Sequence, residues 1–253
     1  MAEKRSEIVV AANFPSLIES AAKRIAARIS NAGSRSAICL TGGSTPKPLY
    51  QRLAAEPYRS ELPWNTIHWF WGDDRFVPLG DERSNAGMAR AAFLDQLPVP
   101  AANIHAIPTN TASPHDAARL YEAELRGFYG GNVLDPQRPL FDLVLMGLGS
   151  DGHTASLFPG QPALNETDRW VVGVEQAGLA PFVPRVSLTF VALASTREMM
   201  FLVSGREKRN AVDRALAGED VPAARAHAVG TLVWLMDRDA APESYSGSAG
   251  GTA

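Results

Sequence analysis

Short apolar runs alternate with helix-like segments along most of this chain. Strands that are separated by helices lie side by side as parallel neighbours, because each helix carries the chain back to the edge where the previous strand began. Helices then cover both faces of the sheet, so its strands are apolar throughout. The pattern predicts an α/β fold with a mainly parallel sheet, helices on both faces, and binding loops at the carboxyl ends of the strands.

The predicted elements run from residue 8 to residue 235. The strands are Ile8–Ala11, Ser36–Leu40, Ile67–Trp71, Ile104–Ile107, Phe141–Met146, Val171–Val174, Val186–Leu188, Met199–Val203 and Thr231–Leu235. The helices are Pro15–Ile29, Pro46–Ala55, Ser84–Leu94, Pro114–Tyr129 and Arg206–Leu216. No linker divides residues 1–238, so we predict one domain. The segment Asp239–Ala253 is rich in Ala, Ser and Gly and is predicted to be a disordered tail.

Composition excludes several classes of partner. A formal net charge of -3 at pH 7 gives no electrostatic reason to expect nucleic acid or an anionic membrane. The richest apolar region, Val186–Val203, is interrupted by Arg197 and Glu198 and is not expected to span a bilayer. The single cysteine, Cys39, forms no intrachain disulfide, and the charged N-terminus does not resemble a signal peptide. We therefore expect a cytoplasmic protein.

The most apolar strand leads into the glycine-rich loop Gly147–Gly152, which is followed by His153. The loop matches the dinucleotide fingerprint G-x-G-x-x-G, but that fingerprint needs a full helix behind its third glycine, and Pro159 follows too soon. An Asp-x-His pair, here Asp151 and His153, can also bind a metal, but no third and fourth ligand follow at typical spacing. We interpret the loop as a site at which the backbone and His153 approach a substrate closely.

The loop Thr41–Thr45 is a second candidate. Gly42 and Gly43, two hydroxyl side chains and the start of a helix at Pro46 form a possible anion cradle of backbone N–H groups and the positive helix end. The alternative is an ordinary strand-to-helix turn with a Ser or Thr cap. The Walker pattern is absent.

Two further interpretations concern the side chains around these loops. Ser44 could act as a nucleophile with Asp73 and His153, although the sequence lacks the last glycine of the nucleophile elbow G-x-S-x-G. Arg185 and Lys208 could complete a phosphate clamp, since an arginine offers a planar fork and a lysine a point charge. For an isolated Arg or Lys, the ordinary alternative is a solvated surface side chain.

Taken together, these motifs resemble the 6-phosphogluconolactonase family, within the wider group of glucosamine-6-phosphate isomerase/deaminase-like proteins. The matching stretches are Leu40–Pro46, Trp71–Pro78, Ser84–Asn85, Met146–Pro159 and Arg185–Thr189. They follow one another in order over nearly the whole chain before the tail. The long stretch Met146–Pro159, with its glycines and His153, is highly specific to the family. The glycine-serine turn in Leu40–Pro46 alone would not identify the family.

The resemblance implies a modified Rossmann-type fold that binds no nucleotide. It implies hydrolysis of 6-phospho-D-glucono-1,5-lactone to 6-phosphogluconate in the oxidative pentose phosphate pathway, with no cofactor and no metal. Gly43 and Ser44 would join Arg185 and Lys208 around the phosphate, and His153 would be the base that activates water. We expect a monomer whose partner is the small sugar-phosphate lactone.

One position departs from the family pattern. The family usually has Asp-Glu-Arg where this chain has Asp73, Asp74 and Arg75, so the resemblance gives Asp74 no defined role. Histidine suits the role of base because the ordinary pKa of an imidazole, ~6.5, lets it accept a proton near neutral pH. Asp151 or Asp73 would orient the imidazole, and Arg75 or loop N–H groups would stabilise the oxyanion.

Two alternatives of other kinds stay open from the sequence. A glucosamine-6-phosphate deaminase shares the scaffold and would release ammonia from an amino sugar. A non-catalytic sugar-phosphate sensor would bind its ligand without turnover, and such a protein normally carries a DNA-binding module for which this chain has no spare length.

Overall fold

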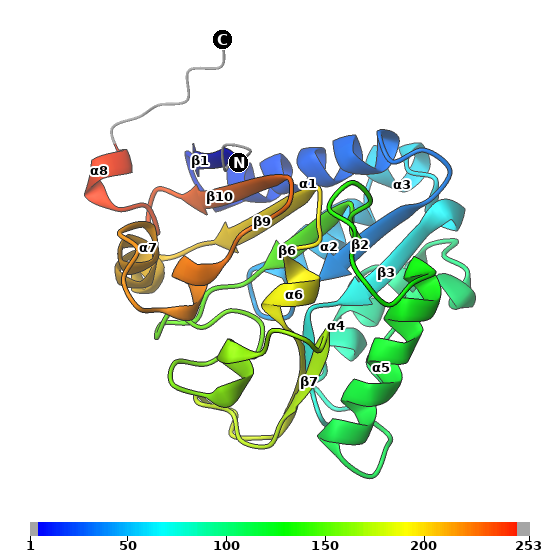
Figure 1. Cartoon of the computed structure of the whole chain (residues 1–253). Helices are drawn as coiled ribbons and strands as arrows, with labels where there is room; N and C mark the ends of the chain where they lie inside the picture. The colour runs from blue at the N-terminus through cyan, green and yellow to red at the C-terminus, as the bar shows by residue number, and fades with distance from the viewer. Residues whose placement is uncertain (1–4, 247–253) are drawn as a thin grey trace.

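The computed structural model describes residues 5–246, which form two sheets with helices around them (Figure 1). Within that range, all strand pairs of the larger, seven-stranded sheet are parallel. In spatial order its strands are β1 (Arg5–Ala11), β10 (Thr231–Asp237), β9 (Glu198–Val203), β6 (Leu143–Met146), β2 (Ser36–Leu40), β3 (Ile67–Trp71) and β5 (Ile104–His105). This confirms the predicted fold class.

Helices pack on both sides of this sheet. The helices are α1 (Phe14–Ser30), α2 (Pro46–Leu53), α3 (Tyr58–Glu61), α4 (Asn85–Ala92), α5 (Pro114–Tyr129), α6 (Phe190–Leu193), α7 (Arg209–Leu216) and α8 (Glu243–Ser246). Figure 1 shows α1 and α2 behind the large sheet and α6 in front of it. The central strands β2, β6 and β9 are buried at every residue, as covering on both faces requires.

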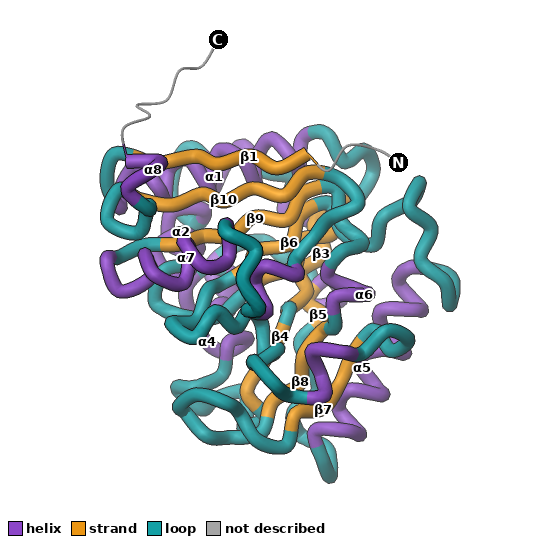
Figure 2. The backbone as a smooth tube through the Cα atoms, turned by 60° about the vertical axis from the view of Figure 1, so that its left-hand side comes forward, coloured by secondary structure: helices purple, strands orange, loops and turns teal. Residues whose placement is uncertain are grey.

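A smaller antiparallel sheet lies beside the larger one (Figure 2). It contains β4 (Asp73–Arg75), β8 (Arg185–Leu188) and β7 (Val171–Val174), in that order from one edge. The strands predicted from the sequence did not include Asp73–Arg75, and that was wrong. The charged run shows no strand pattern of its own and becomes a strand only because β8, distant in sequence, offers it backbone partners.

The start of the predicted tail is also part of the fold. Asp237, at the end of β10, accepts hydrogen bonds from the backbone N–H groups of Ala240, at 2.9 Å to its side chain, and of Ala241, at 3.0 Å to its carbonyl. Both alanines are buried, and α8 follows them. The prediction of disorder from Asp239 onward was therefore wrong for residues up to 246, and its remainder, 247–253, lies outside the described residues.

Helix boundaries follow local capping. Asn13 precedes α1 and accepts a hydrogen bond from the N–H of Ser16 at 2.9 Å, while Ser113 caps α5 in the same way. The predicted helix Arg206–Leu216 is a 3-10 turn over Arg206–Lys208 that continues into α7. Buried apolar side chains from both sheets form one continuous cluster.

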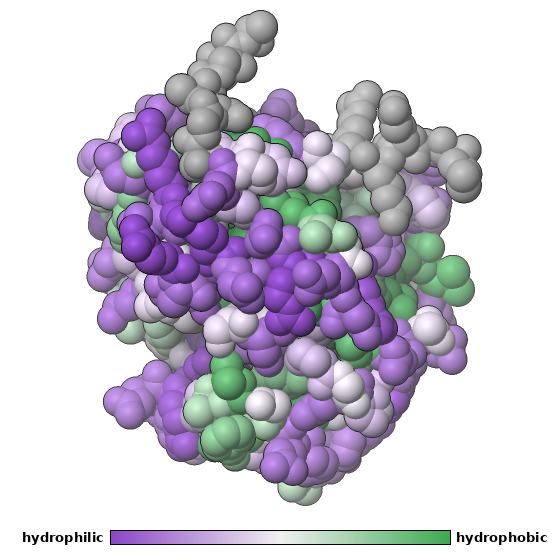
Figure 3. All heavy atoms as spheres, turned by 90° about the vertical axis from the view of Figure 1, so that its left-hand side faces the viewer, coloured by the Kyte–Doolittle hydropathy of each residue, from purple (hydrophilic) through white to green (hydrophobic). Residues whose placement is uncertain are grey.

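The described residues include no helix that is both long and apolar enough to cross a membrane. Figure 3 shows the side of the molecule that faces left in Figure 1, and hydrophilic residues cover most of it.

Three titratable side chains join α5 to the β3–β5 edge of the sheet. Nδ1 of His68 lies 2.9 Å from Nε2 of His105, and Nδ1 of His105 lies 2.7 Å from a carboxylate oxygen of Glu124. Phe70 stacks on the His105 ring. Burial, together with the neighbouring His105 and Arg35, lowers the pKa of His68 to about 4. His68 is therefore held neutral in the folded protein.

We predict that this cluster makes stability depend on pH. The folded pKa of His68 lies below the unfolded value of ~6.5, so stability is fully present above that pH and is lost as the pH falls toward 4. His68→Gln keeps a side-chain donor for His105 but does not titrate. Its Tm should fall less between pH 7 and pH 5 than that of the parent protein; equal falls would contradict the account.

Candidate active site

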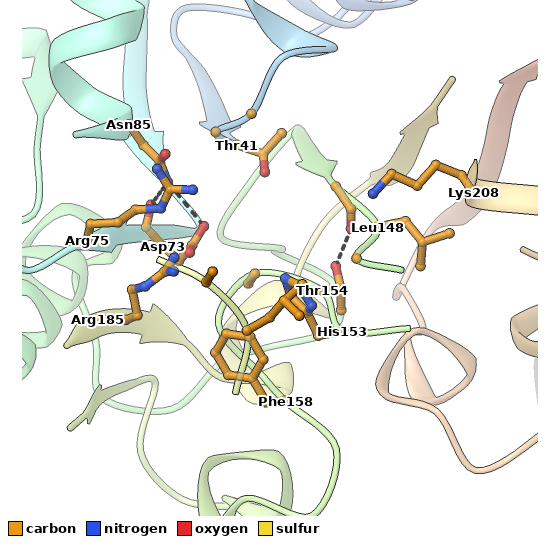
Figure 4. Close-up of a pocket in the computed structure, with 17 residues that line it drawn as sticks. Thr41, Asp73, Arg75, Asn85, Leu148, His153, Thr154, Phe158, Arg185 and Lys208 are labelled. Carbon is orange, nitrogen blue, oxygen red and sulfur yellow. Dashed lines mark hydrogen bonds between the residues drawn. The ribbon is translucent and has the colours of Figure 1, made fainter. Parts of the chain in front are cut away.

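A cavity of ≈ 230 Å³ opens at the carboxyl ends of four neighbouring strands, β9, β6, β2 and β3 (Figure 4). The segment after each of these strands contributes to its lining. Of the residues that the sequence singled out, the pocket brings together Gly42, Gly43, Asp73, Arg75, His153, Arg185 and Lys208. Ser44 and Asp151 are not among its lining residues. The position at the ends of parallel strands is the one predicted from the fold class.

The first glycine loop is built by close contacts. A Cβ on Gly42 would lie 1.8 Å from the side-chain oxygen of Asn85, so only glycine allows these two residues to pack together. Gly43 has a φ of +111, a conformation that side-chain-bearing residues rarely adopt. As predicted, Pro46 opens the following helix. Ser44, however, is exposed.

The second glycine loop carries His153. Nδ1 of the His153 ring lies 2.6 Å from Oδ1 of Asp151, which also accepts the His153 backbone N–H at 3.1 Å. Gly149 lies directly beneath this pair, because a Cβ there would be 2.0 Å from His153 Nδ1. The ring of Phe158 packs against the imidazole with 4.6 Å between ring centroids. These contacts fix the plane of the imidazole.

The Asp151 contact also sets the chemistry of the ring. Burial raises the pKa of Asp151, but the hydrogen bonds from the His153 ring and backbone outweigh burial, so its pKa is lowered overall. An ionised carboxylate only accepts hydrogen bonds, so Nδ1 of a neutral His153 carries the proton and Nε2 carries the lone pair. None of the described residues hydrogen-bonds Nε2. The geometry identifies Asp151, rather than Asp73, as the carboxylate that contacts His153.

Asp73 lies at a different part of the pocket, between two arginines. Arg75 on β4 and Arg185 on β8 are directly opposite one another in the antiparallel pair, and Figure 4 shows Asp73 between their side chains. Arg185 is buried, which lowers its pKa; nearby Asp73 acts against this and Arg75 reinforces it. Arg185 is buried and Arg75 is half-buried, and two like charges on facing strands are unfavourable unless anions such as Asp73 compensate them.

The hydrogen bonds of these two arginines go to backbone carbonyls. Arg75 donates to the carbonyl of Arg83 at 2.7 Å, and Arg185 donates to the carbonyl of Pro181 at 2.9 Å. Nε of Arg75 is buried without a partner among the described residues. Both guanidinium groups therefore keep donor capacity for an anionic ligand.

Asp74 does not line the pocket and instead holds the beginning of α4. Its two carboxylate oxygens accept the backbone N–H groups of Arg75, Asn85 and Ala86 at 2.6 to 3.0 Å and the hydroxyl of Ser84 at 3.3 Å. Burial raises the pKa of Asp74 to about 6, against the effect of these hydrogen bonds. Asp74 thus fixes α4, and with it Asn85, relative to β4.

Lys208 enters the pocket from the opposite wall. It lies in the turn between β9 and α7, and Figure 4 shows it across the pocket from Arg75 and Arg185. The structure therefore brings Arg185 and Lys208 into one pocket but does not place them next to each other.

Some pocket residues were missed as candidates from the sequence. Asn85 and Phe158 line the cavity, and Ser156 donates a hydrogen bond to Asp73 at 2.6 Å. Asn85 carried one usable signal, since it follows the helix cap Ser84 at the end of a strand-loop unit. Ser156 lies in the matching stretch Met146–Pro159, but its loop has no regular periodicity from which the direction of its side chain could be predicted.

The geometry also bears on the alternatives from the sequence. No helix follows the loop Gly147–Gly152 before the 3-10 turn Pro162–Asn165, so the dinucleotide fingerprint lacks its helix, as expected. The partner of His153 is Asp151, while Ser44 is exposed, so the structure does not assemble the proposed nucleophilic triad. Within residues 5–246, no group of three or more His, Cys, Asp or Glu side chains is arranged to hold a metal ion.

Fold and pocket together define an α/β protein with a pocket at the carboxyl ends of parallel strands, lined in part by cationic side chains. Residues 13–234 match the family of glucosamine-6-phosphate isomerases/6-phosphogluconolactonase, and the chain belongs to this family. A 6-phosphogluconolactonase of Synechocystis sp. is 42% identical over 241 residues, which cover 92% of this chain and 96% of the relative. The structure of 6-phosphogluconolactonase from Trypanosoma brucei is 31% identical, with a TM-score of 0.79 over 94% of this chain and 98% of that one.

The same fold also occurs in another branch of enzymes. The structure of a monomeric glucosamine-6-phosphate deaminase matches with a TM-score of 0.78 over 92% of this chain and 98% of that chain, at 19% identity. At this identity the match concerns the fold alone, so fold similarity does not distinguish the two activities.

We predict that Gly149→Ala disrupts the His153 loop. The added Cβ would lie 2.0 Å from His153 Nδ1 and 2.7 Å from Asp151 Oδ1, and relieving such overlap should cost about 1–3 kcal/mol of the free energy of unfolding. Gly147→Ala is the matched control, because its nearest contact would be an ordinary 3.5 Å from Thr41. Equal denaturant midpoints for the two variants would show that the loop tolerates the overlap.

Proposed function

We propose that the protein hydrolyses 6-phospho-D-glucono-1,5-lactone to 6-phosphogluconate, the lactonase step of the oxidative pentose phosphate pathway. The observation that carries the proposal is that His153, which pairs with Asp151, lines one pocket with three cationic side chains, in a chain 42% identical to a 6-phosphogluconolactonase. A lactone already has an electrophilic carbon. The enzyme has to activate water, stabilise an oxyanion and hold the charged end of the substrate.

His153 is proposed as the general base. With its Nδ1 proton directed to Asp151, the Nε2 lone pair removes a proton from water as the water attacks the lactone carbon. Asp151 stabilises the imidazolium that forms and keeps the ring in the required tautomer. Backbone N–H groups of the loop that carries His153 are proposed to face the oxyanion.

The phosphate is proposed to bind at the Arg185 side of the pocket. Gly42 and Gly43 offer backbone N–H groups at the start of α2, and Arg185 offers a guanidinium fork. Arg75 lies directly opposite Arg185, so we assign it to the same end of the substrate. Lys208, on its flexible stem, reaches from the other wall. Ser44 stays part of the proposal as an exposed donor.

The shared fold makes glucosamine-6-phosphate deaminase the second candidate. Ammonia release from glucosamine 6-phosphate separates the two activities directly. We expect lactone hydrolysis above the spontaneous background and no ammonia release; the reverse result would reassign the function.

We further propose that residues 1–238 act as one domain in a cytoplasmic monomer. One continuous buried cluster across both sheets supports the single domain, and a lone buried Cys39 is compatible with a reducing compartment. Light scattering on the purified protein should give a mass close to 27.1 kDa, and twice that mass would contradict the monomer.

The first prediction of the mechanism concerns His153. His153→Ala should lower kcat by about 10²–10⁴, the usual contribution of a general base, with a smaller effect on KM. Lactone hydrolysis is followed with the spontaneous rate subtracted. His227→Ala, at an exposed histidine outside the pocket, is the control and should leave kcat unchanged. A near-normal kcat for folded His153→Ala would remove His153 from the mechanism.

The second prediction concerns the phosphate. Arg185→Ala should raise KM and reduce the preference for the phosphorylated lactone over glucono-1,5-lactone, because the planar charge at this end of the pocket is lost. Arg138→Ala, at an exposed arginine outside the pocket, is the control. If Arg185→Ala keeps the parental KM and preference, the phosphate binds elsewhere.

A further inference from the structure

Ser156 is a buried side chain that joins three parts of the site. It lies in the loop that carries His153, and its hydroxyl donates to Oδ2 of Asp73 on β4 at 2.6 Å. Its backbone N–H donates to the hydroxyl of Ser187 on β8 at 3.2 Å. Ser187 and Asp73 are themselves partners across the antiparallel pair. One serine therefore connects the His153 loop to both strands that carry the arginines.

The residue before Ser156 has an unusual backbone. Ala155 has a φ of 49, which places a residue with a side chain in the unfavourable left-handed region. Such a conformation persists only when its surroundings hold it. Thr154 is fixed on one side by a hydrogen bond to the carbonyl of Gly147 at 2.9 Å, and Ser156 is fixed on the other. Ser156 is thus one anchor of the turn after His153, which a backbone hydrogen bond from the N–H of Leu157 to the carbonyl of Thr154 also closes at 3.0 Å.

The hydroxyl of Ser156 also determines where the Asp73 carboxylate points. The other side-chain donor to Asp73, Nδ2 of Asn85, is 3.4 Å from Oδ1 and so forms a weaker contact. Without the Ser156 hydroxyl, Oδ2 of Asp73 loses its short hydrogen bond inside a buried site. The carboxylate would then turn toward Arg75 or Arg185, which lie on either side of it in Figure 4, and neutralise the charge offered to the substrate.

We propose that Ser156 is a positioning residue for the reaction, acting through Asp73. It keeps the carboxylate between the two arginines without pairing it to either, and it holds the His153 loop against β4. The proposal rests on the proposed lactonase function, since it assigns Ser156 a role in arranging that site.

Ser156→Ala is the first test. It should lower kcat/KM by about 10- to 100-fold, with KM raised as well as kcat lowered, since a small displacement of catalytic groups costs about this much. Ser195→Ala is the matched control: Ser195 is also buried and accepts a backbone N–H, that of Leu140 at 2.9 Å, but outside the pocket. The control should keep the parental kcat/KM. Parental kcat/KM in Ser156→Ala would overturn the proposal.

A double-mutant cycle separates positioning from a general loss of structure. If Ser156 acts through Asp73, then Ser156→Ala should change kcat/KM less than about 3-fold in an Asp73→Asn background. Additive losses would show that Ser156 does not act through Asp73 and would overturn the proposal. If Ser156→Ala does not fold, Ser156→Cys keeps the volume with a weaker donor and should show an intermediate loss that also disappears in the Asp73→Asn background.

Failure of the proposed function would be visible separately. A parent protein that does not hydrolyse the lactone contradicts the function, whatever the variants do. The same cycle is then measured on the Kd for 6-phosphogluconate by calorimetry. Non-additive losses of affinity would uphold the link from Ser156 through Asp73 to the arginines, and additive or absent losses would overturn it.

Discussion

The site depends on a short backbone pairing between two segments that are distant in sequence. Asp73–Arg75 pairs with β8, and this antiparallel register places Arg75 opposite Arg185 and Asp73 opposite Ser187. Two arginines on facing strands repel each other, and their hydrogen bonds to backbone carbonyls do not remove that charge. The surrounding fold has to offset the repulsion between the two arginines. An anionic ligand that relieves this repulsion gains binding free energy.

The large parallel sheet provides the rigid frame for this pairing. Its four neighbouring strands β9, β6, β2 and β3 all end at the pocket, so the loops that follow them converge although they are far apart along the chain. Two of these loops need glycine for close packing rather than for flexibility. Gly42 makes room for Asn85, and Gly149 makes room for the His153–Asp151 pair. Asp74 completes the frame by fixing the start of α4 to β4.

Much of this could be predicted from the sequence, for identifiable reasons. The regular elements have clear periodicity, and Ser36–Leu40, Ile67–Trp71, Pro114–Tyr129 and Val171–Val174 begin and end where predicted. The pocket loops follow directly from strand ends. The strand Asp73–Arg75 could not be predicted, because its only reason to be extended is a partner more than a hundred residues away. The burial of Ala240 could not be predicted either, because it depends on tertiary contacts and the prediction for this segment was based on composition alone.

The side-chain partners show the same division. Sequence left Asp151 and Asp73 as equal candidates to orient His153, and only the loop geometry selects Asp151. Ser44 was grouped with the phosphate ligands, yet it is exposed and does not line the pocket. Ser156 lies in an irregular loop, where the spacing of residues does not indicate which way a side chain points.

The central claim is that one pocket holds the substrate with its phosphate beside Arg185 and its C1 carbon beside Nε2 of His153. A crystal structure with 6-phosphogluconate bound tests it most directly. The account predicts phosphate oxygens within hydrogen-bonding distance of Arg185 and the Gly43 loop, and the C1 carboxylate next to Nε2 of His153. A phosphate bound next to His153, or a ligand bound outside this pocket, would contradict it.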